Sequence, residues 1–177
     1  TPEKLLDIYF SSVGYNSVLL LNVPPDKRGL LADSDIKSLK GFKQLLDKTF
    51  KNNLAKGAII KSTNGINTKA LLDGKYNTFF TTKAKDTTTI VELTLYAAKT
   101  FDVLSLQENI AVGQRIENFV LEYKDGNDWK QLAKGTTIGY KRLLRFKEVT
   151  AKEIRLRILS SRLNPTLSEF GLYKLAK

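Results

Sequence analysis

The chain has 177 residues, of which 42% are hydrophobic and 27% are charged, a mixture typical of a folded domain with a sizeable core. It contains neither histidine nor cysteine, which excludes a Ser-His-Asp triad, a thiol nucleophile, a zinc knuckle and a disulfide. Carboxylate chemistry and a cation held by oxygen ligands remain possible. The formal net charge of +11 is compatible with an anionic partner but does not identify one. No apolar run approaches ~20 residues, so we expect no membrane span.

The N-terminal part begins with the pattern of a helix followed by a strand. The segment EKLLDIYFSSVGYN carries apolar side chains at helical spacing and reaches a plausible helix stop at Gly14. The run SVLLLNV at residues 17–23 is too short for a helix of its own and lacks period-2 alternation. A continuous apolar run of this length is typical of a strand buried on both faces.

A loop and a second helix follow this strand. The two prolines and the glycine of PPDKRG break both kinds of regular structure, so this segment predicts a loop. Asp33 or Ser34 can cap a helix over residues 33–52. The apolar side chains of this segment recur at helical spacing and form one stripe along the helix. A helix, a doubly buried strand and another helix form a piece of a parallel α/β sheet. We therefore expect residues 1–54 to be the tail of a larger α/β domain.

Residues 57–177 are rich in short strands with one face inward. Three runs alternate between apolar and other side chains, and their inward positions are Val91, Leu93, Leu95; Phe119, Leu121, Tyr123; and Ile154, Leu156, Ile158. The turn KDGND between VLEY and Trp129 predicts a hairpin. Strand-like runs that recur about every ten residues indicate a β-sandwich or jelly roll.

Several of these segments resemble one enzyme family. NSVLLLNVPPDKRGLL, followed by SDIKSLKGFKQLL, resembles the end of the catalytic barrel of α-L-fucosidases, which are retaining glycoside hydrolases. ALLDGKYNTFF, YKDGNDW and TLSEFGLY are similar to the discoidin or galactose-binding-like domains that follow such barrels, and ENIAVGQRIENFVLEY and GTTIGYKR resemble the Bacteroides-type tail. The resemblance implies a mainly β fold: a galactose-binding-like β-sandwich (jelly roll) at residues 57–177. A helix–strand–helix remnant of a (β/α)₈-like barrel at residues 1–54 precedes it.

The same resemblance implies a function for the parent protein. It would be an α-L-fucosidase that removes α-L-fucose from glycans, with the sandwich as an accessory or structural domain. The nucleophile and the acid/base of a retaining glycosidase lie about 5 Å apart. In this family they lie on earlier barrel strands, so no catalytic residue is expected here. The implied partners are a fucosylated glycan, through the parent enzyme, and the missing catalytic barrel. The implied location is the bacterial periplasm or the exterior, and no organic cofactor is expected.

Two other functions are weighed against this one. An independent carbohydrate-binding module without catalysis is the alternative, but such a module has no use for a buried strand at residues 17–23. A nucleic-acid partner is not expected, because the positive charge is spread along the chain and no standard nucleic-acid motif occurs.

A structural calcium ion is a further implication of the resemblance. Galactose-binding-like domains often hold one with an Asp, a Thr, loop carbonyls and a late Glu, which here correspond to Asp73, Thr78 and Glu169. From the residues alone, the alternative is an Asx turn at Asp73 with Glu169 exposed.

The resemblance also bears on sugar binding. Galactose-type members usually present an Arg and an Asn where this chain has Glu108 and Gly113, so it departs from their pattern. The residues that could instead contact a glycan or the barrel are Gln114, Arg115, Lys141 and Arg142; the alternative is a set of solvated turn residues. Asn22 and the loop after it either border the sugar pocket of the barrel or simply end a strand.

Two more sets of side chains have two interpretations each. The aromatic residues Tyr76, Phe79 and Phe80 either stack on a sugar or belong to the core. The arginines at positions 142, 145, 155 and 157 either form a basic stripe or occupy the solvated face of their strands.

Overall fold

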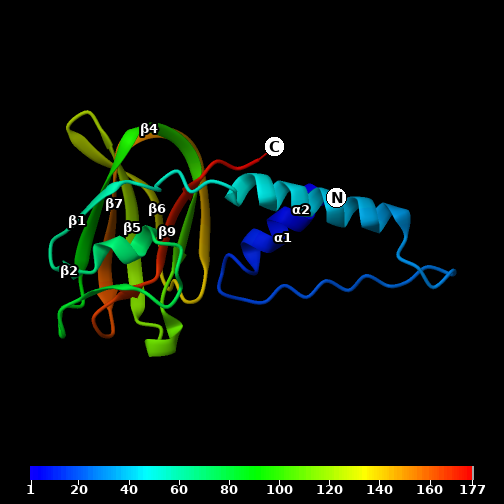
Figure 1. The fold of residues 1–177 in the computed structure, drawn as a ribbon, viewed down its shortest axis with the longest axis horizontal. Coiled ribbons are helices and arrows are strands. Elements are labelled where there is room, and N and C mark those ends of the chain that lie inside the picture. Colours follow the sequence, from blue (N-terminus) through cyan, green and yellow to red (C-terminus); the bar gives the residue numbers. More distant parts are fainter. Residues whose placement is uncertain (177) are drawn as a thin grey trace.

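The computed structural model describes residues 1–176, in which a pair of helices adjoins a larger β-sandwich (Figure 1). The helices are α1 (Pro2–Ser11) and α2 (Asp33–Phe50), and short 3-10 turns lie at Thr68–Leu72 and Ile110–Val112. The strands are β1 (Ile59–Ser62), β2 (Gly65–Ile66), β3 (Phe80–Thr82), β4 (Thr89–Gln107), β5 (Ile116–Asp125), β6 (Asp128–Gly135), β7 (Arg142–Ser161), β8 (Thr166–Leu167) and β9 (Glu169–Tyr173). The predicted sandwich ends at Lys177, which lies outside the described residues.

Two antiparallel sheets make up the sandwich. The larger sheet has the order β1-β4-β7-β5-β6, and the smaller has the order β2-β3-β8. β4 and β7 are the longest strands and pair along most of their length, with a break in register between Thr94 and Lys99. The first half of β4 also pairs with β1 and its second half with β9. The two long strands arch together over one end of the sandwich (Figure 1). The mainly β fold expected from the sequence is confirmed.

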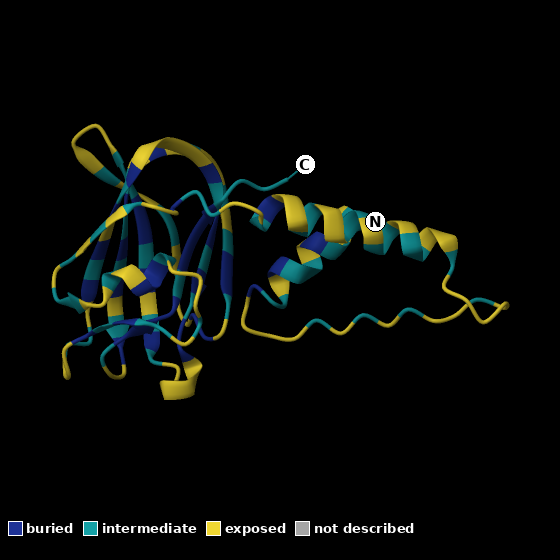
Figure 2. Ribbon diagram, in the orientation of Figure 1, coloured by how far each residue is buried: buried dark blue, intermediate teal, exposed yellow. Residues whose placement is uncertain are grey.

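The core of the sandwich contains the side chains that the alternation predicts. Eight of the nine predicted inward side chains are buried, and Tyr123 is partly buried against them. They join Phe80, Phe101 and Phe170, which are also fully buried, and the dark strands in Figure 2 mark this interior. The predicted hairpin is present, with Asp125 opposite Asp128 across the turn between β5 and β6.

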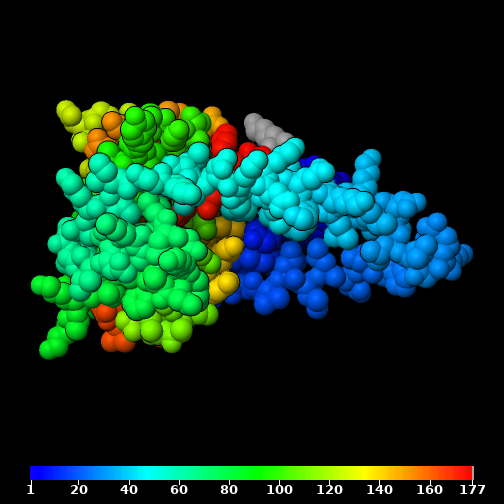
Figure 3. Space-filling view, viewed as in Figure 1, coloured from blue at the N-terminus to red at the C-terminus, as the bar shows by residue number. Residues whose placement is uncertain are grey.

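A second apolar cluster attaches the helices to the sandwich. Leu6 and Phe10 of α1 are buried against Val103 of β4 and Leu143 of β7. Partly buried side chains of α2 and of the C-terminal segment surround them: Phe42, Leu45, Leu46, Phe50, Tyr173 and Leu175. The helical part therefore projects from the sandwich as an arm whose base is held by packing (Figure 3).

The connection between α2 and the sandwich is short and fixed by hydrogen bonds. The side chain of Asn53 donates to the Phe170 carbonyl at 2.8 Å and accepts the Leu172 N–H at 3.1 Å. The Leu54 N–H donates to the Leu172 carbonyl at 2.8 Å. Because these bonds tie the linker to β9, the helices cannot swing freely about it.

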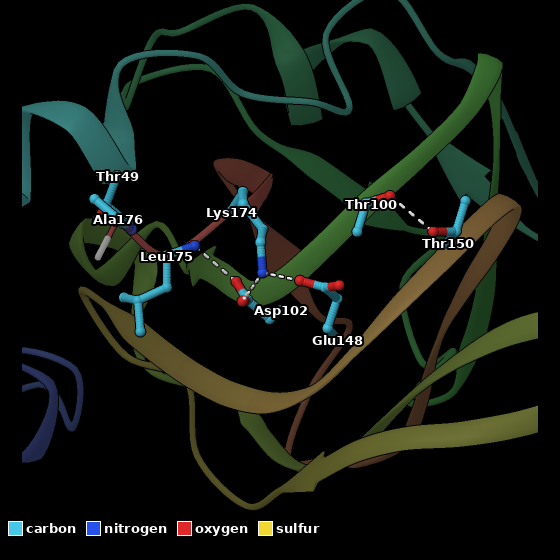
Figure 4. Close-up of polar contacts among 8 residues, drawn as sticks. All are labelled: Thr49, Thr100, Asp102, Glu148, Thr150, Lys174, Leu175 and Ala176. Atoms are coloured by element: carbon cyan, nitrogen blue, oxygen red, sulfur yellow. Dashed lines mark hydrogen bonds and ion pairs between the residues drawn. The ribbon is translucent and has the colours of Figure 1, made fainter.

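The C-terminal segment adds a further attachment (Figure 4). Lys174 pairs with Asp102 and with Glu148, and the Leu175 N–H donates to the Asp102 carboxylate at 2.7 Å. The Ala176 N–H then donates to the Thr49 hydroxyl of α2 at 3.1 Å. The end of the chain therefore bridges the sandwich and α2.

The predicted strand at residues 17–23 is not formed. Its residues leave α1 and run along the helical arm with no β partner among residues 1–176 (Figure 1). Val18 is 87% exposed and Leu20 is 90% exposed, so the expected burial on both faces is also absent. A strand needs neighbouring strands for its hydrogen bonds, and residues 1–176 supply none beside the segment.

The predicted boundaries of the second helix also need correction. The helix ends at Phe50 instead of residue 52, and its N-cap is Ala32, not Asp33 or Ser34. Ala32 forms no side-chain cap hydrogen bond, while Asp33 and Asp35 in the first turn favour the positive end of the helix dipole. No helix in the described part of the chain has the length and apolar character needed to span a bilayer.

Candidate functional site

An acidic turn at residues 73–78 lies beside the last strand of the sandwich. Asp73 accepts the Lys75 N–H at 2.8 Å with one oxygen and the Thr78 hydroxyl at 2.6 Å with the other. Glu169, the first residue of β9, lines the same cleft as Gly74. The structure thus brings the three residues of the predicted calcium site together. It also contains the Asx turn that is the alternative interpretation of Asp73.

Glu169 has an unfavourable environment for a carboxylate. Burial, followed by the negative charge of Asp73, raises the pKa of Glu169 to about 7. Its Oε1 atom is buried and has no hydrogen-bond partner within residues 1–176. A cation beside both carboxylates would remove their repulsion and give Oε1 a partner. The described chain contains no cluster of three acidic, histidine or cysteine side chains suited to a metal, so Thr78 and carbonyl oxygens would have to complete the ligand set.

Glu108 is completely buried and fastens two loops to each other. Its Oε1 accepts the N–H groups of Arg115 and Ile116, each at 2.9 Å, and its Oε2 accepts the Gly139 N–H at 2.8 Å. Its own N–H donates to the Gly139 carbonyl at 2.8 Å. The position at which the resemblance places a sugar-binding arginine therefore holds a carboxylate committed to backbone donors.

Arg115 and Gln114 occupy one of these loops. The Arg115 guanidinium donates to the Val112 carbonyl and, at 2.9 Å, to both the carbonyl and the side-chain oxygen of Asn164. Asn164 donates in turn to the Thr81 hydroxyl at 2.8 Å. Gln114 is exposed. All hydrogen bonds of the Arg115 side chain thus stay within the sandwich.

The loop that contains Arg142 faces the N-terminal part of the chain. The Arg142 guanidinium lies 3.8 Å from the centroid of the Tyr15 ring. The Asn16 side chain accepts the Tyr140 N–H at 2.7 Å. These contacts end directly before the unpaired segment at residues 17–23. Of the predicted interdomain residues, Arg142 therefore contacts the helical part of this chain.

Lys141, the neighbour of Arg142, lines a cleft of about 310 Å³ between the end of α2 and the sandwich. Its walls include Phe50, Tyr76, Gln107, Tyr140 and Glu169. Tyr76 thus reaches this cleft, whereas Phe80 is fully buried in the core. Lys141 and one predicted calcium ligand, Glu169, share the same depression.

Asn22 lies apart from all of these residues. It is exposed, and the loop after it turns where the Asp26 carboxylate pairs with Arg28 at 2.6 Å. α2 has 18 residues and separates this loop from the sandwich by about 27 Å, at ~1.5 Å per residue. The structure therefore does not bring Asn22 together with Gln114, Arg115, Lys141 or Arg142.

The four arginines considered for a basic stripe divide into two pairs. Arg155 and Arg157 both contact Glu122, and the Arg155 guanidinium lies 4.4 Å from the Trp129 ring centroid. Arg145 pairs with Asp7 of α1 at 2.7 Å, and Arg142 faces Tyr15. Since each has a partner within the chain, they form no continuous basic stripe.

The polar residues that organise these loops are ones that the sequence reasoning did not predict. Asp7, Tyr15 and Asn16 join the helical part to the sandwich, and no pattern in the sequence marks them. Glu108 had a signal, because it follows Leu104 and Leu106 at the spacing of one strand face. An acidic side chain in that inward position requires buried hydrogen-bond donors.

Comparisons with known proteins agree with this architecture. The model of the F5/8 type C domain family matches residues 55–170. Alpha-L-fucosidase 1 of Arabidopsis thaliana is 35% identical over 180 residues, which cover 96% of this chain and 36% of that protein. The structure of a Ruminococcus gnavus GH29 fucosidase in complex with fucose superimposes with a TM-score of 0.93 and 36% identity, over 100% of this chain and 37% of the other. A glycoside hydrolase 29 family member from an unknown rumen bacterium gives a TM-score of 0.77 at 29% identity, over 100% and 29%.

The extent of these matches confirms the family expected from the sequence. The chain spans little more than a third of the length of the Arabidopsis and Ruminococcus relatives, and it corresponds to their C-terminal part. The matches to whole enzymes run through the helical arm as well as the sandwich. With the family model matched over residues 55–170, the chain belongs to the F5/8 type C, discoidin-like domain family.

Proposed function

We propose that this chain is the C-terminal part of an α-L-fucosidase and that its sandwich is an accessory domain with a mainly structural role. The observation that carries this proposal is the similarity to solved GH29 enzymes over 100% of the chain, helices included. One of these enzymes was solved with fucose bound. The paired carboxyl groups of a retaining glycosidase would then belong to the remainder of the protein.

The unpaired segment at residues 17–23 supports a missing α/β neighbour. No backbone hydrogen bond of residues 18–25 is found within residues 1–176, and Val18 and Leu20 are almost fully exposed. Apolar burial is worth ~25 cal/mol per Å², so neighbouring barrel strands would stabilise this segment on both faces. An independent carbohydrate-binding module would gain nothing from exposing it. The exposed segment therefore favours the C-terminal part of a larger enzyme over an independent carbohydrate-binding module.

The position of the sandwich supports a structural role. It packs at the end of α2 that lies far from the loop at residues 24–29 (Figure 1). In a (β/α)₈-like barrel this loop follows the last strand and lies on the active-site face. The sandwich would then brace the opposite end of the last βα unit. The proposed substrate of the longer protein is a fucosylated glycan, and the proposed location of that protein is the periplasm or the exterior of the cell.

The first prediction concerns activity. The 177-residue chain should not hydrolyse aryl α-L-fucosides, because the proposal places both catalytic carboxyl groups upstream. The longer protein that contains this chain should hydrolyse them. Release of the aryl group, followed by absorbance, measures both. Turnover by the chain alone that is abolished by substituting one of its own carboxylates would contradict the proposal.

We also propose a structural calcium ion held by Asp73, Thr78, Glu169 and loop carbonyls. The Asp73–Thr78 contact, the unpartnered Oε1 of Glu169 and the repulsion between the two carboxylates support it. The ion would fix the 73–78 turn against the start of β9. Its role would be structural, because its ligands would join the turn at residues 73–78 to Glu169 at the start of β9.

The second prediction is a pH dependence that calcium removes. The raised pKa of Glu169 means that the folded chain keeps a proton there which the unfolded chain has already lost. In chelator, stability should therefore fall as the pH rises from about 5 to about 8. Calcium binds the ionised carboxylate, so its stabilising effect should grow over the same interval. Melting temperatures at several pH values, with chelator and with excess calcium, measure both trends.

Two variants make this prediction specific. The chain has no histidine, so Glu169 is the side chain expected to dominate between pH 5 and 8. Glu169→Gln should flatten the pH trend and remove the calcium effect, while Glu92→Gln, at an exposed position of β4, should change neither. An unchanged melting temperature of the wild-type chain on adding calcium at pH 8 would refute the calcium site.

A further inference from the structure

Acidic side chains are almost absent from one stretch of the surface, the basic face at residues 36–72. Cationic residues are spread along the whole chain, but this stretch holds eight lysines and a single acidic residue, Asp47, which gives it a net charge of +7. Lys43 pairs with Asp47 at 2.6 Å. The other seven lysines are exposed and form no ion pair within residues 1–176. Figure 3 shows these segments, from light blue to turquoise, on the side turned to the viewer.

An apolar groove opens within the basic face. It has a volume of about 490 Å³ and lies between β1 and the 3-10 turn at Thr68–Leu72. Ala58, Ile60 and Leu72 line it and are only partly buried against the core. Ile59, which also lines the groove, is 66% exposed. Exposed apolar side chains that are gathered in a hollow and surrounded by charges are typical of an interaction site.

The charges around the groove are mostly positive. Lys69 lines it, and Lys56 and Lys61 each lie one residue outside the lining run at residues 57–60. The carboxylate of Asp73 also lines the groove, but its two oxygens already accept the Thr78 hydroxyl and a backbone N–H. A partner with carboxylates would therefore meet three lysines that have no ion pair of their own.

The strand beside the groove has a free edge. β1 is the outermost strand of the larger sheet and pairs only with β4 within residues 1–176. In an antiparallel pair alternate residues bond to the partner strand, so the other residues of β1 direct their N–H and C=O groups outward. No further backbone hydrogen bond of residues 59–62 is found in the described part of the chain. Lys61 disfavours pairing with β1 of a second copy, because two lysines would meet, but it favours an acidic strand.

From these three features we propose that β1 and the groove form a docking site for an extended acidic polypeptide segment. The segment adds a strand beside β1 and places an apolar side chain in the groove. Its carboxylates face Lys56, Lys61 and Lys69. A nucleic acid would match the charge, but it would supply neither a strand for β1 nor an apolar side chain for the groove. This proposal is independent of the fucosidase assignment, and its test does not measure hydrolysis.

The test is fluorescence anisotropy of a labelled peptide of alternating glutamate and valine, titrated with the 177-residue chain. We expect a Kd below about 100 μM that rises with the salt concentration. A peptide of alternating lysine and valine should not bind. A peptide of alternating glutamate and proline keeps the carboxylates but loses strand donors, so it should bind about tenfold more weakly or worse. Equal binding of the proline peptide, or of an oligothymidylate of the same charge, would overturn the proposal.

Three variants of the chain locate the site. Lys61→Glu reverses a charge beside the groove and Ile59→Gln removes an apolar contact, so each should raise the Kd about tenfold or more. Lys134→Glu makes the same charge reversal on β6, at the opposite edge of the same sheet, and should leave the Kd unchanged. All three positions are exposed, so the melting temperatures should stay close to that of the wild type. No binding up to about 1 mM, or equal weakening by Lys61→Glu and Lys134→Glu, would overturn the proposal.

Discussion

Replacing Glu108 by alanine should lower the free energy of unfolding by about 3 kcal/mol or more, since it strands three backbone donors inside the loops. The Glu108 carboxylate accepts the N–H groups of Arg115, Ile116 and Gly139, and its side chain is wholly buried. A lost hydrogen bond to a charged group costs ~1.5–3 kcal/mol, and two of the three donors, the N–H groups of Ile116 and Gly139, belong to buried residues. Urea unfolding followed by circular dichroism measures the loss.

Matched variants separate this effect from loss of charge. Glu108→Gln keeps one acceptor oxygen and should cost less than Glu108→Ala, but its NH₂ group would face a backbone N–H. Glu117 of β5 accepts the Ser160 hydroxyl at 2.6 Å and pairs with Arg162 near the surface, so Glu117→Ala should lower the free energy of unfolding by less than Glu108→Ala. If Glu108→Ala and Glu117→Ala lowered the free energy of unfolding equally, the three buried hydrogen bonds of Glu108 would contribute no more to stability than the contacts of Glu117.

A second large effect is expected where α1 meets the sandwich. Phe10 is 4% exposed, and its ring packs beside Phe50 of α2 and Leu143 of β7. Its ring centroid also lies 4.7 Å from the Arg145 guanidinium. Phe10→Ala should cost ~3–5 kcal/mol, as expected for a large buried aromatic residue. Because the lost contacts join the helices to the sandwich, the helices of this variant should also unfold independently of the sandwich.

Two spectroscopic probes can follow the two parts. The single tryptophan, Trp129, lies in β6 and reports on the sandwich, while circular dichroism at 222 nm reports largely on the helices. The two unfolding curves should coincide in the wild type. In Phe10→Ala the helical signal should be lost at lower urea concentration. Ile8→Ala changes a residue of the same helix outside the apolar cluster and should keep the curves together. Coincident curves for Phe10→Ala would refute a coupling through this cluster.

Patterns of apolar residues predicted most of the sandwich. The alternation in the runs at Val91, Phe119 and Ile154 depends on burying one strand face, a local property that the sequence shows directly. The pairing of β4 with both β1 and β9 was not predictable in this way. β1 pairs with residues 91–94 of β4 and β9 with residues 103–107, and apolar alternation along one strand does not show which other strands lie beside it.

The run SVLLLNV shows a different limit. Its composition is typical of a buried strand, but burial and strand pairing depend on neighbours that residues 1–176 do not supply. The structure therefore displays the segment exposed, with Val18 and Leu20 in solvent. An apolar run indicates that a segment is suited to burial. Whether the segment is buried depends on neighbouring elements, and the described residues contain none that cover this one.

The site residues divide in the same manner. Asp73, Thr78 and Glu169 were placed by short motifs that resemble a known family, and they do come together. The contacts of Arg142 with Tyr15 and of Arg145 with Asp7 join residues more than a hundred positions apart. Polar contacts between parts so distant in the chain leave no periodicity to read, so only the folded structure reveals them.

The central claim, that residues 17–23 are a strand of a missing α/β barrel, is tested most directly by Leu20→Asp in two contexts. In the 177-residue chain Leu20 is 90% exposed, so the substitution should change the free energy of unfolding by less than about 0.5 kcal/mol. In the longer protein it would bury an unpaired carboxylate, so fucosidase activity and folding should both be lost. Tyr96→Asp, at a 96% exposed position of β4, should be tolerated in both. A longer protein that carries Leu20→Asp with wild-type stability and activity would contradict the claim.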